Sequence, residues 1–411
     1  MIMEEKATQV SIKEHNIGLI IKNVKENQSV TRIRLSIATR LAKSTISDLV
    51  SYLIDKKVLS EGKKINSKLG KKPIILKFNK DLFYIIAINI GIGYITVAIA
   101  NLFGDIITKV KNRNDARGSR ESILNNIFNT VEEALKKSEI NFKKIYIISI
   151  GTHGVVDPKS KVVTHAPYFK NWSGINLYEV FNKKYKKDVV VENSINLGTI
   201  GEQWKTYPDI NNLIYLDVNY GAGAGIIINK ELVTGTHGST GEISYLPILK
   251  NYDFERLKDN TLELGLFEAQ VDIVGIVNKV KEVAQRIKTD KNFKREIADI
   301  DFEYICKLYN DPNVNFIKKV IDEDVLKVLA IGIASIITII DTEIVVISGA
   351  IIDLGEKFIK RLKDEVYYMV PFKPEIVTSS LKKDAVILGT VKFGINHMDN
   401  LFYNHFFSIR L

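Results

Sequence analysis

The sequence predicts an α/β chain that joins a small helical module to a larger two-lobed body. The chain's whole excess of positive charge lies in residues 1–80, where helix-like apolar spacing is followed by a basic β-ribbon. From residue 81 onward, apolar strands alternate with helices. A glycine-cornered strand pair near residue 84 recurs near residue 213, which indicates two similar lobes that face a cleft.

Length and composition are those of an ordinary globular protein with more than one domain, since the chain has 411 residues. Cys306 is the single cysteine, which excludes an internal disulfide and favours a cytoplasmic location. Residues 1–10 contain acids and no apolar run, so we expect no signal peptide. The most apolar stretch, Val325 to Ile340, is too short for a confident bilayer span, and we expect a buried helix and no membrane partner.

The positive charge is concentrated at one end of the chain. Residues 1–80 hold 17 Lys and Arg against 7 Asp and Glu, an excess equal to the chain's formal charge of +10. The remaining residues hold 41 basic and 41 acidic side chains. This asymmetry is typical of a nucleic-acid-binding module attached to a neutral body. The alternative is a lysine-rich surface that is merely solvated.

Apolar spacing predicts helices over residues 11–26, 31–39 and 43–56. In the third helix, apolar residues recur every three or four positions, so one face is buried and the other is polar. Two short helices in tandem, the second beginning in small polar residues, form the layout of a helix-turn-helix. The residues expected to pack the second helix are Ile33, Leu35 and Ile37.

A two-stranded wing is predicted to follow, from Val58–Ser60 and Pro73–Phe78. Residues 56–80 contain nine lysines and one acid, Glu61, which suits contact with DNA phosphates. The alternative for such a segment is a plain helical bundle. We expect the major groove to be contacted by Lys43, Ser44, Thr45 and Ser47. We expect phosphates to be contacted mostly by Arg32, Arg34, Arg40 and the wing lysines, including Lys71 and Lys72.

Three domains follow from these patterns. The winged helix-turn-helix spans 1–80, the first lobe spans 81–200 and is completed by the C-terminal helix within 383–411, and the second lobe spans 201–382. An aromatic-rich end, 397–411, packs against a lobe or against a partner subunit, and the sequence leaves both open. The later helices are expected at about 266–289, 301–309, 314–340, 354–368 and 383–397.

Short motifs extend along nearly the whole chain. They are Lys13-Glu14-His15-Asn16, Gly70-Lys71-Lys72-Pro73, Asn89-Ile90-Gly91-Ile92-Gly93-Tyr94 and Asn193-Ser194-Ile195-Asn196. In these motifs the chain resembles the ROK family of bacterial repressors and sugar kinases, and its N-terminal part resembles the repressor branch that includes the xylose repressor. The resemblance implies an actin-like, sugar-kinase-like fold for the two lobes.

The positions that carry phosphoryl transfer in the family's kinases are altered here. Asn89 stands where those kinases have an aspartate, Tyr94 replaces a lysine, and Tyr220 replaces a threonine near Asp217. Ser194 stands where the resemblance places the general base, and a serine hydroxyl cannot accept a proton near neutral pH without a base of its own. Glu192, two residues away, is the alternative base. We therefore expect a protein that is not an enzyme and binds no nucleotide cofactor.

A sugar site is better preserved in the resemblance. Two carboxylates and an amide that converge on a cleft can accept and donate several hydrogen bonds to sugar hydroxyls. The implied contacts are Asn193, Glu242 and Glu268, with His153, Tyr245 and Trp172 as further candidates. Trp172 is expected either to stack on a sugar or to lie in the core. Tyr245 stands at the family's zinc-binding histidine and the cysteine ligands are missing, so we expect no metal.

Three functions remain open from the sequence. The first is a repressor of carbohydrate genes whose sugar effector, with xylose as first choice, changes its affinity for double-stranded operator DNA. Glucose, other pentoses and oligosaccharides stay open as effectors, and we expect a homodimer or a dimer of dimers. The second function is an active ROK sugar kinase with an accessory DNA-binding domain. The third is a DNA-binding factor with no small-molecule site.

Overall fold

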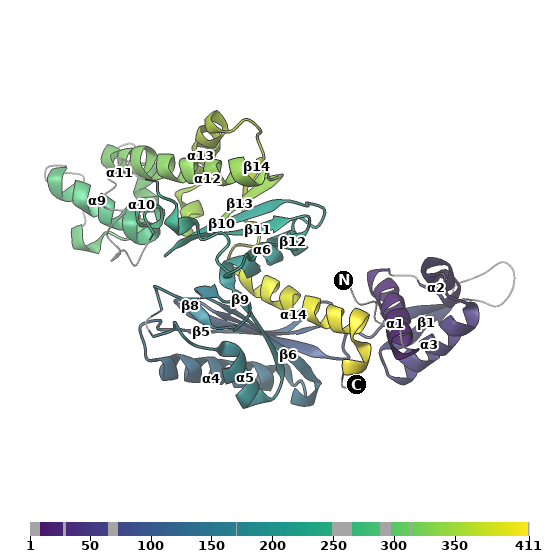
Figure 1. Cartoon of the computed structure of the whole chain (residues 1–411). Helices are drawn as coiled ribbons and strands as arrows, with labels where there is room; N and C mark the ends of the chain where they lie inside the picture. The colour runs from purple at the N-terminus through teal and green to yellow at the C-terminus, as the bar shows by residue number, and fades with distance from the viewer. Residues whose placement is uncertain are drawn as a thin grey trace.

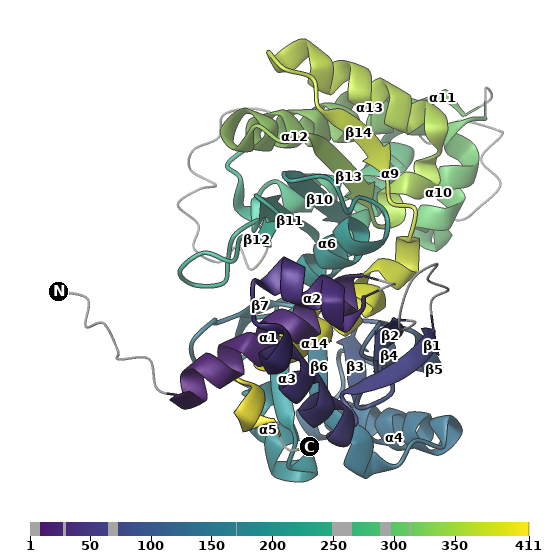
Figure 2. The same ribbon diagram turned by 90° about the vertical axis from the view of Figure 1, so that its right-hand side faces the viewer.

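The computed structural model describes residues 9–27, 30–64, 73–169, 171–248, 265–287, 297–311, 314–409 and 411. Figure 1 shows the N-terminal module, in purple, at one end of a body made of two α/β lobes. A long C-terminal helix, in yellow, runs from the junction of the lobes toward the module. The C-terminus therefore lies beside the module, as Figure 1 and Figure 2 show.

The module consists of helices α1, α2 and α3 followed by a two-stranded antiparallel hairpin. Their bounds are α1 (Gln9–Glu26), α2 (Arg32–Thr39), α3 (Lys43–Asp55), β1 (Leu59–Lys64) and β2 (Ile74–Phe78). The Thr31 hydroxyl caps α2 by accepting the Arg34 N–H at 3.3 Å. Arg40 ends α2 with a φ of 59°, which turns the chain into α3. The hairpin pairs Leu59 with Phe78, and it is the wing that the sequence predicts.

The expected packing of α2 is partly wrong. Leu35 is fully buried, but Ile33 and Ile37 are 56% and 75% exposed. Ile33 and Ile37 are four positions apart and share one side of the helix, whereas Leu35 points to nearly the opposite side, so all three cannot be buried together. Leu35 faces the module core with residues of α1 and α3, which leaves the side with Ile33 and Ile37 exposed.

The first lobe is built on a sheet in the order β5-β4-β3-β6-β9. Its strands are β3 (Tyr84–Ile90), β4 (Tyr94–Asn101), β5 (Ile106–Arg113), β6 (Ile145–Thr152) and β9 (Asp188–Asn193). Strands β3, β6 and β9 are parallel, so their carboxyl ends meet at one edge. Helices α4 (Arg120–Ser138) and α5 (Leu177–Tyr185) cover one face in Figure 1. A short hairpin, β7 (Val155–Val156) with β8 (Val163–His165), lies near that edge.

The second lobe repeats this plan with a sheet in the order β12-β11-β10-β13-β14. Its strands are β10 (Leu213–Val218), β11 (Ala222–Ile228), β12 (Glu231–Leu232), β13 (Ile344–Ser348) and β14 (Glu375–Thr378). The predicted glycine-cornered hairpin is tighter than expected, because Gly223 and Gly225 lie inside β11. At Gly225 a Cβ would overlap the Thr199 side chain, so close packing against a helix explains the glycine.

Helices fill the rest of the second lobe. They are α8 (Glu268–Val271), α9 (Ile273–Ile287), α10 (Phe302–Tyr309), α11 (Asn315–Val320), α12 (Leu326–Ile340) and α13 (Glu356–Met369). The helix expected over 266–289 is therefore two helices, with Asp272 between them. A π-helical turn, Ile321–Val325, joins α11 to α12. The apolar stretch 325–340 is a buried helix of this lobe, as predicted. None of the helices in the described ranges combines the length and apolarity that a bilayer span requires.

Helices α6 (Ser194–Lys205) and α14 (Ala385–Asn404) lie face to face where the lobes meet. Helix α6 packs against β10 and β11, and α14 packs against β3 and β6. At Gly201 a Cβ would overlap the Ala385 carbonyl, and at Gly389 a Cβ would overlap the Leu197 carbonyl. Glycine therefore brings the two helix backbones into direct contact. The lobe boundary expected at residue 200 falls within α6.

The C-terminal end of α14 and the segment after it pack against the module. Phe402 is fully buried and meets Phe78 of the wing edge to face, with ring centroids 5.5 Å apart. Phe406 meets Tyr52 of α3 at 6.3 Å. Figure 2, viewed from the module side, shows α1 crossing in front of α14. The aromatic tail thus joins the module to the first lobe of its own chain.

The crossing of α1 and α14 has no room for a side chain at Gly18, because a Cβ there would overlap the Tyr403 backbone carbonyl. We expect Gly18→Ala to lower the free energy of unfolding by about 1–3 kcal/mol through overpacking. Urea denaturation of both proteins measures the difference. Gly93→Ala is the control, because a Cβ at Gly93 meets nothing within 4 Å. Equal denaturation midpoints for wild type and Gly18→Ala would contradict the tight crossing.

Candidate functional site

The amino-terminal half of α3 presents a polar, solvent-facing surface. Lys43, Ser44 and Ser47 are exposed and Thr45 is half-buried. The opposite face of α3 buries Ile46, Leu49, Val50 and Leu53 in the module core. The residues predicted for the major groove are therefore accessible from one side of one helix, which is the arrangement that groove reading requires.

The predicted arginines differ in their surroundings. Arg34 and Arg40 are exposed at the start and end of α2. Arg32 forms an ion pair with Glu61 of the wing at 2.9 Å. Both partners are partly exposed, so the pair adds little stability but holds the wing against α2. Arg32 is therefore engaged in positioning the wing, a role that the sequence does not suggest.

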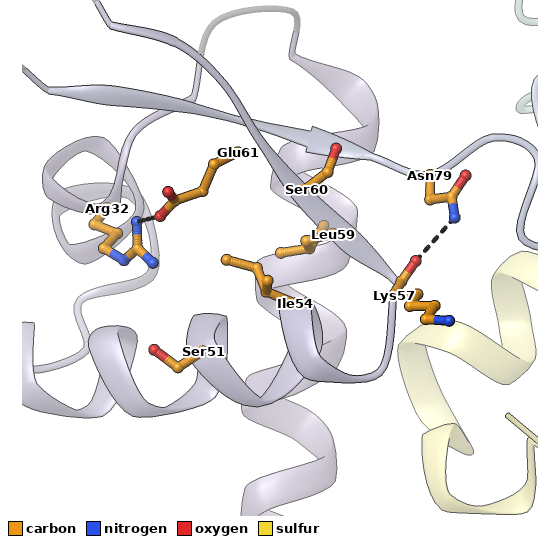
Figure 3. A pocket seen from close by; sticks show the side chains of 8 residues that line it. All are labelled: Arg32, Ser51, Ile54, Lys57, Leu59, Ser60, Glu61 and Asn79. Carbon is orange, nitrogen blue, oxygen red and sulfur yellow. Dashed lines mark hydrogen bonds and ion pairs between the residues drawn. The ribbon is translucent and has the colours of Figure 1, made fainter.

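A hollow of about 660 Å³ lies between the carboxyl-terminal half of α3 and the wing. Figure 3 shows the Arg32–Glu61 pair on one side of this hollow, and the Asn79 amide donating to the Lys57 carbonyl on the other. Its lining residues are Arg32, Ser51, Ile54, Lys57, Leu59, Ser60, Glu61 and Asn79. On β1, Lys63 and Lys64 are exposed. Lys71 and Lys72 lie outside the described residues.

The second group of predicted residues lies where the lobes meet. Asn193 ends β9 and caps α6, because its Oδ1 accepts the Ile195 N–H at 2.7 Å. Its Nδ2 donates to the Gly154 carbonyl at 2.8 Å. The amide is thus held in one orientation, and one N–H and one lone pair remain for a ligand.

Two of the altered kinase positions face each other beside Asn193. The Ser194 hydroxyl donates to Asn89 Oδ1 at 3.4 Å, so a hydroxyl and an amide meet at this point. Glu192, the alternative base, accepts the Asn193 N–H at 2.8 Å and the Asn196 side-chain amide at 2.9 Å. Both bonds fall on one carboxylate oxygen, Oε1, which ties Glu192 to the start of α6. Burial raises its pKa.

Glu268 lies in the second lobe with 6% of its surface exposed. Its carboxylate accepts the Ala222 N–H at 3.1 Å, at the end of the glycine-rich turn between β10 and β11. Burial, with the nearby carboxylates of Asp272 and Glu242, raises the pKa of Glu268 to about 7. In an anion-binding turn, this backbone N–H would be free to bind a phosphate. Here it already donates to the Glu268 carboxylate. Burial also raises the pKa of Glu242.

Aromatic and histidine side chains of the first lobe meet these acids. His153 packs edge to face on Tyr168 at 5.8 Å, and burial lowers the pKa of His153 to about 4. The Tyr168 hydroxyl donates to Asp272 Oδ2 at 2.9 Å across the lobes. A second interlobe hydrogen bond joins the Tyr245 hydroxyl and His165 Nε2 at 2.7 Å. Neutral His153 can both donate and accept, as recognition of a sugar hydroxyl requires.

The stacking role considered for Trp172 does not fit its position. Trp172 is fully buried in the first-lobe core, and its Nε1 donates to the Thr152 hydroxyl at 2.9 Å. A ring that is covered by core residues has no face left for a sugar. The core alternative is the correct one.

Sequence reasoning missed Tyr168 and Asp272 as members of this interlobe cluster. Asp272 follows Glu268 by four residues, a spacing that places both on one side of a short helical turn. No such periodic signal marks Tyr168, which lies on an irregular segment after β8. Among the described residues, no group of three or more His, Cys, Asp or Glu side chains is arranged to hold a metal ion.

Comparison with known families decides the classification. The model of the ROK family matches residues 85–394, which is most of the chain. The chain belongs to the ROK family. The family resemblance suggested by the sequence motifs is therefore confirmed, and the winged module lies outside the matched segment.

Individual relatives of this ROK protein extend over the module as well. It is 28% identical to the xylose repressor of Caldicellulosiruptor bescii over 393 residues, 94% of this chain and 97% of that protein. Its fold is similar to that of a ROK family transcriptional regulator described as a homolog of the E. coli MLC protein, with a TM-score of 0.78, 21% identity and coverage of 95% and 98%. A ROK glucokinase from Streptomyces griseus, at TM-score 0.62 and 20% identity, covers 75% of this chain and 98% of its own.

The raised pKa of Glu268 predicts a pH-dependent stability. In the unfolded chain Glu268 ionises near its ordinary value of 4.5, and in the fold near 7, so wild type loses stability as pH rises through this window. Glu268→Gln carries no ionisable group at this position. We therefore expect the free energy of unfolding of wild type to fall, relative to that of Glu268→Gln, by roughly 2–3 kcal/mol between pH 5 and pH 8. Ligand-free thermal unfolding at several pH values measures this. Glu231→Gln, at an exposed position on β12, is the control, and a pH-independent difference for Glu268→Gln would contradict the assignment.

Proposed function

We propose that this ROK protein is a DNA-binding transcriptional repressor that responds to a sugar and has no kinase activity. The observation that carries the proposal is the contact between Ser194 and Asn89, where the family's kinases use carboxylates. A hydroxyl that donates to an amide cannot remove a proton from a sugar near neutral pH. The basic winged module supplies the alternative role, which is DNA binding. The similarity to a xylose repressor covers 94% of this chain and so includes this module.

The absence of kinase activity has further support in the glycine-rich turn. Phosphoryl transfer depends on positioned positive charge and free backbone donors around the phosphates. Here Glu268 accepts the Ala222 N–H, and Tyr220 stands exposed beside the same turn. A buried carboxylate at this place repels a polyphosphate instead of binding it.

The proposed effector is a neutral monosaccharide, with xylose as the first candidate. Its contacts are Asn193, Glu242, Glu268 and His153, with Tyr245 at the rim. Carboxyl groups with raised pKa values, an oriented amide and a neutral imidazole together offer both donors and acceptors to hydroxyl groups. The names of the relatives support xylose, because several of them are xylose repressors.

The proposed partner is double-stranded operator DNA, bound by a homodimer or a dimer of dimers in the cytoplasm. Lys43, Ser44, Thr45 and Ser47 contact base edges, and Arg34, Arg40 and the wing lysines contact phosphates. Arg32 positions the wing through its ion pair with Glu61 and contacts the DNA backbone beside the wing. Two modules would engage half-sites about 34 Å apart, or a multiple of that distance.

We expect the purified protein to select a specific duplex from a random DNA pool, and this binding to change at least fivefold with one sugar of a panel. Fluorescence anisotropy with and without xylose, glucose, arabinose and their disaccharides measures the change. Release of ADP from magnesium-ATP and the same sugars is followed in parallel and is expected to stay at background. Sugar-dependent turnover that Glu192→Gln abolishes would establish the kinase alternative, and failure to select any duplex would exclude a repressor.

The wing is expected to act through charge. Lys63→Ala and Lys64→Ala should each weaken binding to selected and unrelated duplexes alike, and lower the slope of log K against log salt by about 1. Titration at several salt concentrations measures the slope. Lys318→Ala, an exposed change on α11 in the second lobe, is the matched control. A loss confined to the selected duplex would show that these lysines read bases instead.

A further inference from the structure

Tyr168 connects the first lobe to the second at the proposed sugar site. Its hydroxyl donates to Asp272 Oδ2 at 2.9 Å, and Asp272 is 1% exposed. The other oxygen of Asp272 accepts the Gly275 N–H at 2.5 Å, which ties the carboxylate to the start of α9. The phenol is thus held by a group that is itself immobilised, and the Tyr168 ring has one preferred position.

The Tyr168 ring lies between proposed contacts from both lobes. On one side it meets the His153 ring edge to face at 5.8 Å. On the other side, its Cε2 lies 3.4 Å from the position that a Cβ on Gly221 would occupy, and Glu268 Oε1 lies 2.7 Å from that same position. The Tyr168 ring thus lies close to proposed sugar contacts from both lobes.

We propose that Tyr168 is the specificity-determining residue of this site and restricts the effector to a single sugar ring. The proposal rests on the sugar-binding function proposed above. An aromatic side chain is large and has two rotatable bonds, so it fills space at little conformational cost. Because the hydroxyl is bound to Asp272, the ring cannot swing aside to admit a second sugar unit.

Asp272 acts in this scheme as a positioning residue. Both of its oxygens already accept hydrogen bonds, one from Tyr168 and one from the α9 backbone. Burial and the neighbouring carboxylates Asp272 and Glu268 raise the pKa of the Tyr168 phenol. The phenol therefore keeps its proton and remains a donor to Asp272 over the physiological pH range.

The test compares wild type with Tyr168→Ala, Tyr168→Phe and Asp272→Asn, using xylose and xylobiose as probes in thermal-shift and calorimetric titrations. Wild type is expected to bind xylose and to bind xylobiose at least tenfold more weakly. Tyr168→Ala should reverse or abolish this preference. Tyr168→Phe keeps the ring but loses the hydrogen bond that holds it, so the ring can swing aside and the preference for xylose should fall at least threefold. Asp272→Asn leaves one accepting oxygen for two donors, from Tyr168 and Gly275, and should lower the preference in the same direction. Tyr178→Ala, an exposed tyrosine change on α5, is the matched control.

The outcomes separate this proposal from the one on which it rests. If wild type binds no sugar, the sugar-responsive function fails and the specificity role fails with it. If wild type binds xylose and Tyr168→Ala keeps the wild-type ratio of xylose to xylobiose affinity, Tyr168 does not determine specificity. Should Tyr168→Ala not fold, Tyr168→Phe decides, because an unchanged ratio of xylose to xylobiose affinity in that variant would show that the bond to Asp272 does not hold the ring in place.

Discussion

The position of the DNA-binding module depends on a hydrophobic core that continues into the body of the protein. Ile17 and Phe78 of the module, Ile85 of β3 and Phe402 of α14 all belong to one buried cluster. Domains that move independently usually have separate cores and a solvated linker. Lys25 of α1 adds an ion pair with Asp399 of α14 at a largely buried position. The module, the first lobe and α14 therefore form one packed unit.

The interlobe cluster has the electrostatic character of a site for a neutral polar ligand. Glu268, Glu242 and Asp272 come together in this cluster, and burial raises the pKa of each. A polyphosphate with its metal ion needs ionised carboxylates and cationic donors in this region. Partly protonated carboxyl groups donate as well as accept, and that suits hydroxyl groups. The proposed lack of phosphoryl transfer and the proposed sugar recognition thus have one physical basis.

Much of the fold follows from local pattern, and much of the site does not. Helical spacing predicts α1 and α3, because each of them buries one periodic face. Continuous apolar runs predict α12, β3 and β10, which are buried on nearly all sides. The pattern fails where burial is decided by distant residues, as at Ile33 and Ile37 on α2. Asn193 is identified from a motif, but its capping of α6 is not. Tyr168 escapes sequence reasoning because its partner, Asp272, lies 104 residues away.

The contact between α6 and α14 is the place where any movement of one lobe relative to the other has to occur. Helix α6 packs on the second-lobe sheet and begins at Asn193, while α14 packs on the first-lobe sheet and continues into the module core. Their backbones are in direct contact at Gly201 and Gly389, where no side chain separates the two helices. A ligand that fixes Asn193 against Glu268 fixes the second lobe relative to this packed unit. Because the module and the first lobe share one buried core, a change in the orientation of the module within this chain is a change relative to the second lobe.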